Sequence, residues 1–473
     1  MSQDSPPFAR SAAPAGPAAG SGAPPAVPGL WRHVWETAAL AVPVMIARSG
    51  NLAMITADVI MTGHYRAADL AFYSLGYMAH QVLYVLGLGG LMGTTVLASQ
   101  ADGMGQAWRS GTVWRVGLAH SLLLGLLFAA LSLAGERFFL AAGQTPLLAA
   151  EGGAVMIAFA LGLPPLLMHV GTAQFLEGIS RPRANMWLML GANALNLLLN
   201  WLLIYDHAFT TLGGQGAVGA ALATSLTRWG MFVALAGTVL LMRDRHRYGI
   251  RGPLHYPLDV GRKLRQLGLP LMLAQGLESA SFLMVALMAG WLGTRQLAVY
   301  QIANNLFAIV FMLALGLATA MSVRVGNAAG RGDRVGVAWA GWCGAGLGFA
   351  LFGLIGTGFL AAPHWLAGIY TEDPAVRALA SPVIAIAGLV VVVDGGQALM
   401  VGALRGVGDI VVPSCMAVGG FWLVNVPLAY WLAVAQGWGV AGLLWALAAG
   451  TGTATALLLA RFRTVSRRAV RPV

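Results

Sequence analysis

Long apolar stretches, separated by short polar or glycine-rich breaks, dominate the pattern of residues along this chain. A helix that crosses a bilayer needs about 20 mainly apolar residues, and twelve stretches reach that length. We place them at residues 37–63, 70–98, 112–134, 152–175, 184–204, 216–242, 264–292, 297–323, 336–361, 379–403, 411–435 and 440–461. None alternates apolar and polar residues as a membrane β-barrel strand does, and an open strand in lipid would leave backbone groups unpaired. The pattern therefore predicts an all-α integral membrane protein with twelve transmembrane helices.

The composition leads to the same prediction. Of the 473 residues, 58% are hydrophobic and 10% are charged, and the mean hydropathy is +0.74. Soluble domains carry about 25% charged residues, so an ordinary water-soluble protein is excluded. Lipid must be the solvent for most of the chain.

The basic residues divide unevenly between the two sides of the membrane. With twelve helices, 22 of the 28 Lys and Arg residues fall on the side of both termini and four on the other side, while Arg48 and Arg228 lie inside helices. Cytoplasmic loops carry such an excess. We therefore expect a multi-pass membrane protein with both termini in the cytoplasm. The net charge is +11, and the basic residues lie between the apolar stretches. This placement indicates a lipid bilayer as the partner and no nucleic acid.

The first 30 residues differ from the rest of the chain. They hold seven prolines among Ala, Gly and Ser, and they lack the basic start and apolar run of a cleavable signal. Such a composition predicts a disordered N-terminal arm over residues 1–30.

The chain also repeats itself. A shift of 227 positions, without a gap from Leu40 to Gln106, aligns Leu40 with Leu267, Pro43 with Pro270, Gly63 with Gly290, Tyr73 with Tyr300, and Gly89 with Gly316. Six helices were therefore duplicated. Because an even number of helices makes both copies enter the membrane from one face, we expect a pseudo-twofold axis along the membrane normal and a binding site between the halves.

This repeat predicts the organisation of the whole chain. We expect an N-terminal six-helix lobe at residues 31–242, a cytoplasmic linker at 243–263, a C-terminal six-helix lobe at 264–461 and a basic cytoplasmic tail at 462–473.

Three carboxylates lie well inside predicted helices: Asp58, Glu278 and Asp394. An ionisable group at the centre of a membrane costs about 2.5–3.5 kcal/mol on insertion scales and is a functional candidate by default. A carboxylate out of water is stabilised by a proton or a metal cation, so these acids are candidates for coupling to H⁺ or Na⁺. The alternative is a structural ion pair with Arg48 or Arg228.

Amide side chains accompany the acids. Asn196 and Asn200 are four residues apart, which places them on one face of a helix, and we expect them to contact Asp58, with Thr224 as a further partner. Packing between helices is the alternative role. Tyr300, Gln301 and Asn305, with the neighbouring Asn304, have the same two interpretations in the second half, and Arg48 is a secondary candidate beside them.

No enzyme signature competes with transport. The chain has no His-Glu-x-x-His motif, no phosphate-binding P-loop and no paired Asp-rich loop. We therefore expect no catalytic residues, no cofactor and no transport driven by ATP hydrolysis in this chain.

Several motifs resemble those of one transporter family. They are Ala41-Val-Pro-Val-Met-Ile-Ala47 before Asp58, Gly268-Leu-Pro-Leu271 before Glu278, Tyr300-Gln-Ile-Ala-Asn-Asn305, Ser322-Val-Arg-Val-Gly326, Leu404-Arg-Gly-Val-Gly-Asp409, Phe175-Leu-Glu-Gly178 and Arg181-Pro-Arg183. Over about residues 35–460 the sequence resembles the multidrug and toxic compound extrusion (MATE) transporters, most of all their NorM-like bacterial branch.

The resemblance implies two six-helix lobes around a V-shaped cavity. It also implies export of small-molecule drugs and organic cations in exchange for Na⁺ or H⁺, across the bacterial cytoplasmic (inner) membrane. Because the predicted interior is acidic and lined by amides and the chain has no ATP site, we expect alternating access by a rocking motion. Asp58, Glu278 and Asp394 fall on the family's three membrane carboxylates, and Asn196 and Asn200 fall on amides near the first of them. Glu278 and Asp394 are the expected ligands if Na⁺ binds, and a monomer is expected.

Two features leave alternatives open. Val390 stands where NorM-like relatives place a Tyr, which with Arg48 weighs against a relative-like Na⁺ site in the second half. A flippase for a lipid-linked precursor, built on a related fold, is the second candidate function. It predicts a cationic cavity, to which Arg48 and Arg228 would contribute.

Overall fold

The computed structural model describes residues 30–206, 213–252 and 257–468. The predicted disordered arm, apart from Leu30, and the end of the predicted basic tail lie outside these residues. The described part of the chain is helical and contains no strand, as the apolar pattern predicts.

The helices follow the predicted stretches closely. The first half comprises α1 Leu30–Tyr65, α2 Ala67–Leu91, α3 Gly93–Gly103, α4 Ala107–Ser132, α5 Gly135–Ala141, α6 Pro146–Ala160, α7 Leu163–Gly178, α8 Arg183–Ile204 and α9 Gly216–Leu240. The second half comprises α10 Leu258–Trp291, α11 Thr294–Gly330, α12 Arg334–Ala361, α13 Pro363–Tyr370, α14 Pro374–Gly406, α15 Val411–Gly419, η1 Gly420–Asn425, α16 Val426–Ala429, η2 Tyr430–Ala435 and α17 Gly439–Val465. The helix α10 begins inside the predicted linker 243–263.

The predicted number of spans is confirmed within the described residues. Eleven helical stretches are long and apolar enough to cross a membrane, and α6 with α7 forms a twelfth that bends by 45°. Pro164 and Pro165 lie in the first turn of α7, where a missing N–H costs no helical hydrogen bond. The two prolines therefore mark the start of a new helix within one span.

The last two spans differ in regularity. The stretch from α15 to η2 contains two six-residue π-helical segments, η1 and η2, on either side of Pro427 in α16. A proline cannot donate to the carbonyl four residues earlier, and such interruptions favour a local change of helical pitch. The neighbouring α17 is continuous from Gly439 to Val465.

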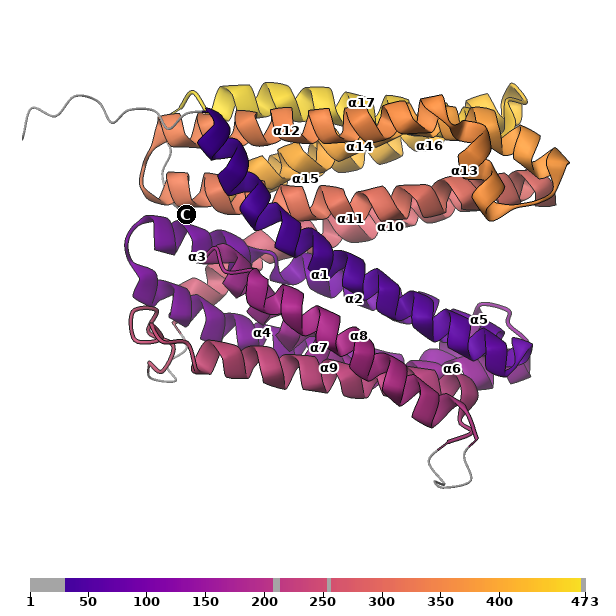
Figure 1. Ribbon diagram of the computed structural model, residues 1–473, viewed down its shortest axis with the longest axis horizontal. Helices are drawn as coiled ribbons and strands as arrows, with labels where there is room; N and C mark the ends of the chain where they lie inside the picture. Colours follow the sequence, from indigo (N-terminus) through magenta and orange to yellow (C-terminus); the bar gives the residue numbers. More distant parts are fainter. Residues whose placement is uncertain (1–29, 207–212, 253–256, 469–473) are drawn as a thin grey trace, which may run out of the picture.

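Figure 1 shows the helices in two groups, with α1–α9 in one and α10–α17 in the other. Across the boundary, α1 packs against α11 and α2 packs against α10. In the internal repeat, α1 corresponds to α10 and α2 corresponds to α11. A twofold rotation therefore turns the contact of α1 with α11 into the contact of α10 with α2. The contacts agree with the axis that the repeat predicts.

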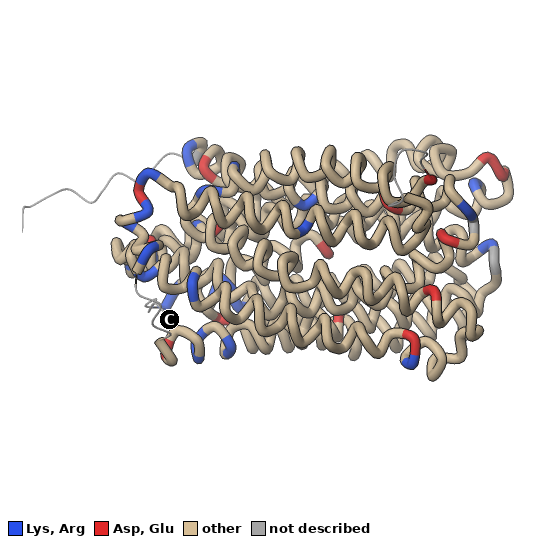
Figure 2. Tube along the Cα trace, turned by 90° about the horizontal axis from the view of Figure 1, so that it is seen from below, with Lys and Arg blue, Asp and Glu red and all other residues tan. Residues whose placement is uncertain are grey.

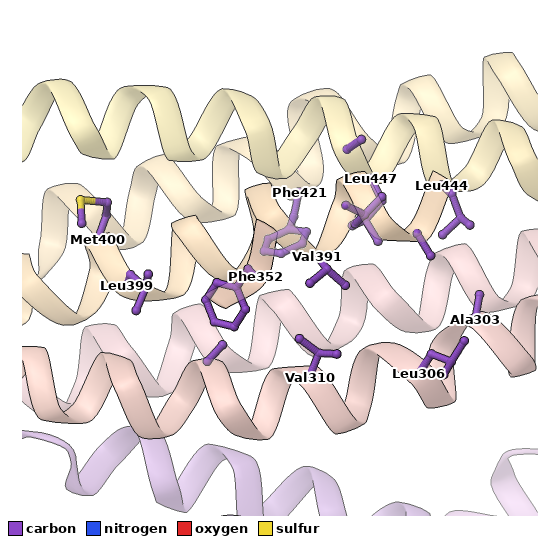
Figure 3. Close-up of a cluster of buried hydrophobic side chains, with 14 of the residues drawn as sticks. Ala303, Leu306, Val310, Phe352, Val391, Leu399, Met400, Phe421, Leu444 and Leu447 are labelled. Atoms are coloured by element: carbon purple, nitrogen blue, oxygen red, sulfur yellow. The ribbon is translucent and has the colours of Figure 1, made fainter. Parts of the chain in front are cut away.

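The largest cluster of buried apolar side chains lies in the second half. Figure 3 shows Phe352 of α12 near Val391 of α14 and Phe421 of η1, with Leu447 of α17 beside them. Lipid is as apolar as these side chains, so the helices associate through close packing. Gly395 of α14 leaves the space that the ring of Phe352 fills.

Candidate functional site

Asp58 of α1 lies in a sealed polar site within the first half. Its carboxylate accepts hydrogen bonds from Tyr73 Oη at 2.9 Å, Asn200 Nδ2 at 2.6 Å and Thr224 Oγ1 at 2.6 Å. The donors come from α2, α8 and α9. The side chain is fully buried, so four spans enclose one carboxylate.

A second pair of hydrogen bonds orders these donors. Asn196 Nδ2 donates to Thr224 Oγ1 at 3.1 Å, and Asn200 Nδ2 also reaches Asn196 Oδ1 at 3.1 Å. The spacing of four residues in α8 thus directs both amides toward Asp58, as expected from the sequence. Asn200 Oδ1 is buried and has no hydrogen-bond partner, so an acceptor lies next to the carboxylate.

The hydrogen bonds explain how Asp58 is tolerated. Burial of an ionised Asp at mid-membrane costs about 2.5–3.5 kcal/mol on insertion scales. A hydrogen bond to a charged group contributes about 1.5–3 kcal/mol, so the three donors can offset this cost. The hydroxyls of Tyr73 and Thr224 can also accept hydrogen bonds, so the site can accommodate a protonated carboxyl.

Tyr73, which sequence reasoning did not select, connects this site with the middle of the molecule. Its ring stacks on Tyr77 with centroids 5.9 Å apart, and Tyr77 Oη donates to Gln81 Oε1 at 2.9 Å. Tyr77 and Gln81 line a central cavity. One aromatic side chain therefore separates the contacts of Asp58 from that cavity.

The central cavity has a volume of about 560 Å³ and lies between the halves. Side chains from α1, α2, α10, α11 and α14 line it, among them Glu278 and Asp394. Its apolar wall includes Phe282, Phe307 and Phe311. A cavity of this size with an apolar wall and a few polar groups is typical of a small-molecule site.

Glu278 and Asp394 differ from Asp58 in exposure. Both line the central cavity, and both also line an adjoining cavity of about 80 Å³. Gln275 Nε2 donates to Glu278 Oε2 at 2.9 Å. The structure thus brings the two predicted acids of the second half to one cavity, apart from the enclosed Asp58.

Arg48 of α1 lines the same cavity but is paired elsewhere. Its Nη2 lies 3.9 Å from Glu177 Oε1 of α7, and the Glu177 side chain is only 4% exposed. Sequence reasoning missed Glu177 because it lies beyond the predicted end of its span at residue 175. Among the described residues, no ion pair joins Arg48 to Asp58, Glu278 or Asp394, so this form of the ion-pair alternative is wrong.

Arg228 of α9 forms no ion pair with a carboxylate in the described part of the chain. Its Nη1 lies 2.9 Å from His80 Nε2, and its guanidinium lies 5.5 Å from the centre of the Phe159 ring. His80 stacks on the same ring at 4.5 Å. Arg228 is therefore accommodated by a histidine and an aromatic ring.

The secondary candidates in α11 are dispersed. Asn304 faces the central cavity, whereas Asn305 accepts a hydrogen bond from Tyr370 Oη at 2.9 Å. Tyr300 is buried in the apolar cluster of the second half, and Gln301 is exposed. Val390 lines the cavity near Asp394 in α14. The structure thus places Asn304 in the cavity and none of Tyr300, Gln301 and Asn305 in its lining.

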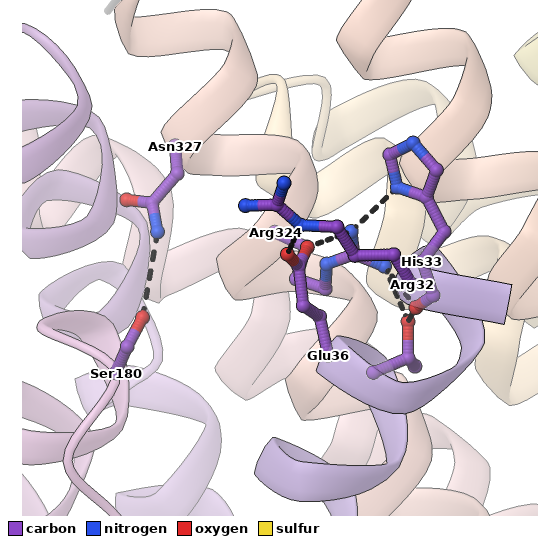
Figure 4. Close-up of polar contacts among 7 residues, drawn as sticks. Arg32, His33, Glu36, Ser180, Arg324 and Asn327 are labelled. Atoms are coloured by element: carbon purple, nitrogen blue, oxygen red, sulfur yellow. Dashed lines mark hydrogen bonds and ion pairs between the residues drawn. The ribbon is translucent and has the colours of Figure 1, made fainter. Parts of the chain in front are cut away.

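The two halves are joined at the end of the molecule where α1 begins (Figure 4). Arg324 of α11 donates to the backbone oxygen of His33 at 2.7 Å and forms an ion pair with Glu36 at 2.8 Å. Asn327 of α11 lies 3.5 Å from Ser180 Oγ. Gln100 of α3 donates to the backbone oxygen of Gly406 in α14 at 3.0 Å. These contacts hold the halves together on one side of the cavity.

Comparison with known proteins gives consistent matches over most of the chain. Residues 43–202 and 270–431 match the MatE family. The two segments begin 227 residues apart, which is the shift of the internal repeat. The chain is 35% identical over 445 residues to the probable multidrug resistance protein NorM of Caulobacter vibrioides, with 92% of each protein covered. It is 34% identical over 445 residues to the multidrug resistance protein NorM of Burkholderia vietnamiensis, with 92% of this chain and 95% of that protein covered.

Solved structures show a similar fold. The eukaryotic MATE transporter AtDTX14 superposes with a TM-score of 0.84 at 18% identity, covering 93% of this chain and 99% of that one. An outward-facing multidrug resistance MATE family transporter of the MOP superfamily gives a TM-score of 0.84 at 19% identity, covering 92% and 96%.

Proposed function

The chain belongs to the MatE family, and from that premise we propose that it is a secondary active antiporter that exports organic, often cationic, compounds in exchange for H⁺ or Na⁺. The observation that carries the proposal is the division of three membrane carboxylates between two environments. Asp58 is enclosed by hydrogen-bond donors, whereas Glu278 and Asp394 face a central cavity.

The cavity supports the proposed substrate class. Two carboxylates attract a cation, while Phe282, Phe307 and Phe311 provide apolar and π surface for an organic body. Met312 adds an adaptable contact. Two relatives that are 34–35% identical to this chain are named as multidrug resistance proteins. Their names agree with a cavity of this kind.

The two environments also suggest how the coupling ion acts. Binding of H⁺ or Na⁺ at Asp58 changes the hydrogen bonds of Tyr73, whose ring stacks on Tyr77 at the cavity wall. A cation at Glu278 and Asp394 competes directly with a cationic substrate for negative charge. Both effects release the substrate when the coupling ion binds. Rocking of the halves then closes the cavity on the side of release and opens it to the cytoplasm.

The orientation follows from the distribution of charge. Figure 2 shows Lys and Arg concentrated at the end of the molecule where α1 begins, with few at the opposite end. By the positive-inside rule that end is cytoplasmic. The contacts of Arg324 with His33 and Glu36 lie at this end, which supports an outward-facing state. We propose the bacterial inner membrane as the location and a single chain as the whole pathway.

The lipid-linked precursor flippase has less support. It requires a cationic cavity, and Arg228 is paired with His80 away from the cavity. Glu278 and Asp394 bring negative charge to the same lining as Arg48.

Efflux of ethidium from cells tests the proposal. Asp58→Asn, Glu278→Gln and Asp394→Asn, made singly, should each slow efflux at least about tenfold, the equivalent of about 1.4 kcal/mol. Asp259→Asn, an exposed acid at the start of α10, is the matched control and should retain wild-type efflux. Wild-type efflux by all three variants of the membrane carboxylates, at normal surface expression, would overturn the role of these acids in coupling.

A further inference from the structure

A second cavity lies at the lipid-facing seam between the halves. It has a volume of about 270 Å³ and is formed by the end of α2, by the start of α3, by α4 and by the first half of α10. Leu123, Leu127 and Leu269 on its rim are 50–66% exposed. The cavity is therefore open toward the surrounding bilayer and separate from the residues that line the central cavity.

The lining of this seam cavity is polarised along the membrane normal. Thr94, His120 and Arg265 lie toward the end where α10 begins, whereas Leu127 and Met272 lie one to two turns farther into the membrane. Arg265 Nη1 lies 3.3 Å from His120 Nε2, which links α10 of one half to α4 of the other. Polar groups are thus at the cytoplasmic end of the cavity and apolar groups at its membrane end.

Additional positive charge lies close to Arg265 along the chain. Arg262 and Lys263 are exposed on the same turn of α10 as Arg265. Each Lys or Arg near an anionic leaflet contributes about 1 kcal/mol of attraction, or about fivefold in affinity. The apolar lining matches an acyl chain, and the basic rim matches a phosphate.

We propose that the seam cavity binds one anionic phospholipid of the cytoplasmic leaflet, with its phosphate at Arg265 and an acyl chain between α4 and α10. The lipid contacts both halves, so it stabilises the conformation in which α2 and α10 are packed together. This ligand is distinct from the exported substrate, and its binding does not depend on the transport activity proposed above.

Native mass spectrometry and thermal unfolding of the purified full chain test the proposal. In nanodiscs of phosphatidylcholine with added phosphatidylglycerol, the protein should retain one phosphatidylglycerol and unfold at a higher temperature than in phosphatidylcholine alone. Arg265→Gln should reduce retention by more than the factor of about five that the loss of one surface charge causes. Leu124→Trp, which fills the cavity from α4, should abolish it.

Two substitutions serve as matched controls. Arg262→Gln removes another exposed charge from the same turn, and Leu131→Trp adds the same bulk at an exposed position of α4 outside the cavity. Arg262→Gln should retain the lipid more strongly than Arg265→Gln, and Leu131→Trp more strongly than Leu124→Trp. Equal retention by Arg265→Gln and Arg262→Gln, or undiminished retention by Leu124→Trp, would overturn the specific site and leave only general attraction to anionic lipid.

Discussion

At the scale of single residues, the environment of each membrane carboxylate decides what it can do. Asp58 accepts three hydrogen bonds and has no exposed surface, whereas Glu278 has one hydrogen bond, from Gln275, and faces a cavity. The first arrangement suits a small coupling ion. The second leaves room for an organic cation.

Sequence reasoning identified part of this site. Asp58, Asn196, Asn200 and Thr224 are polar residues in apolar stretches, so the cost of burying them marks them as partners. Tyr73 was missed because an aromatic residue fits a membrane helix without any polar partner, and only the fold brings its hydroxyl to Asp58.

Tyr73→Phe tests the link between Asp58 and the cavity. The substitution removes one hydrogen bond to the carboxylate, worth about 1.5–3 kcal/mol, and keeps the ring that packs on Tyr77 and Phe159. We expect folded protein with slower ethidium efflux and an altered dependence on the imposed pH or Na⁺ gradient. Tyr205→Phe removes a hydroxyl that donates to the backbone oxygen of Met61 and should leave this dependence unchanged. An identical gradient dependence in Tyr73→Phe and wild type would contradict the link.

At the scale of elements, the twelve spans could be predicted because apolar length is itself the signal. The short helices α5 and α13 could not, since seven or eight residues between spans carry no such pattern. The break between α6 and α7 lies next to Pro164 and Pro165 in the first turn of α7. The close packing of α2 on α10 depends on which faces meet, which a single sequence does not specify.

Glycine is essential where α2 and α10 meet. A Cβ on Gly268 would clash with the backbone of Gly90 in the facing helix, and overpacking of this kind costs about 1–3 kcal/mol. Gly268→Val should therefore disfavour the present conformation about fivefold or more. Disulfide formation between cysteines introduced as Ser180→Cys and Asn327→Cys, in a background with Cys343 and Cys415 replaced, reports the change.

The matched control lies on the same helix. Gly290 of α10 has no neighbouring atom within reach of an added Cβ, so Gly290→Val should give the wild-type disulfide yield. Equal yields in Gly268→Val and Gly290→Val would show that the close approach of α2 and α10 does not control the conformation.

At the scale of the whole molecule, the account requires the halves to separate at the end where α1 begins. The duplication and the charge bias predict two matched lobes with that end in the cytoplasm, but the sequence does not indicate which end is closed. The contacts of Arg324, Asn327 and Gln100 show that the closed end is the one where α1 begins.

Locking that end should stop transport. Oxidation of the Ser180→Cys, Asn327→Cys pair joins two segments whose side chains are 3.5 Å apart, and we expect ethidium efflux to fall to background and to recover on reduction. Each single cysteine variant should be insensitive to oxidant. Full efflux by the quantitatively cross-linked protein would contradict alternating access through this end.

The most direct test of cation-coupled export is substrate movement in proteoliposomes that contain only the purified protein. A pH gradient and a Na⁺ gradient are imposed separately, with wild type and Asp58→Asn compared. The account predicts that at least one gradient drives uphill movement of ethidium by the wild type and that Asp58→Asn abolishes this movement. Failure of both gradients to drive the functional wild-type protein, or equal driving of Asp58→Asn, would contradict it.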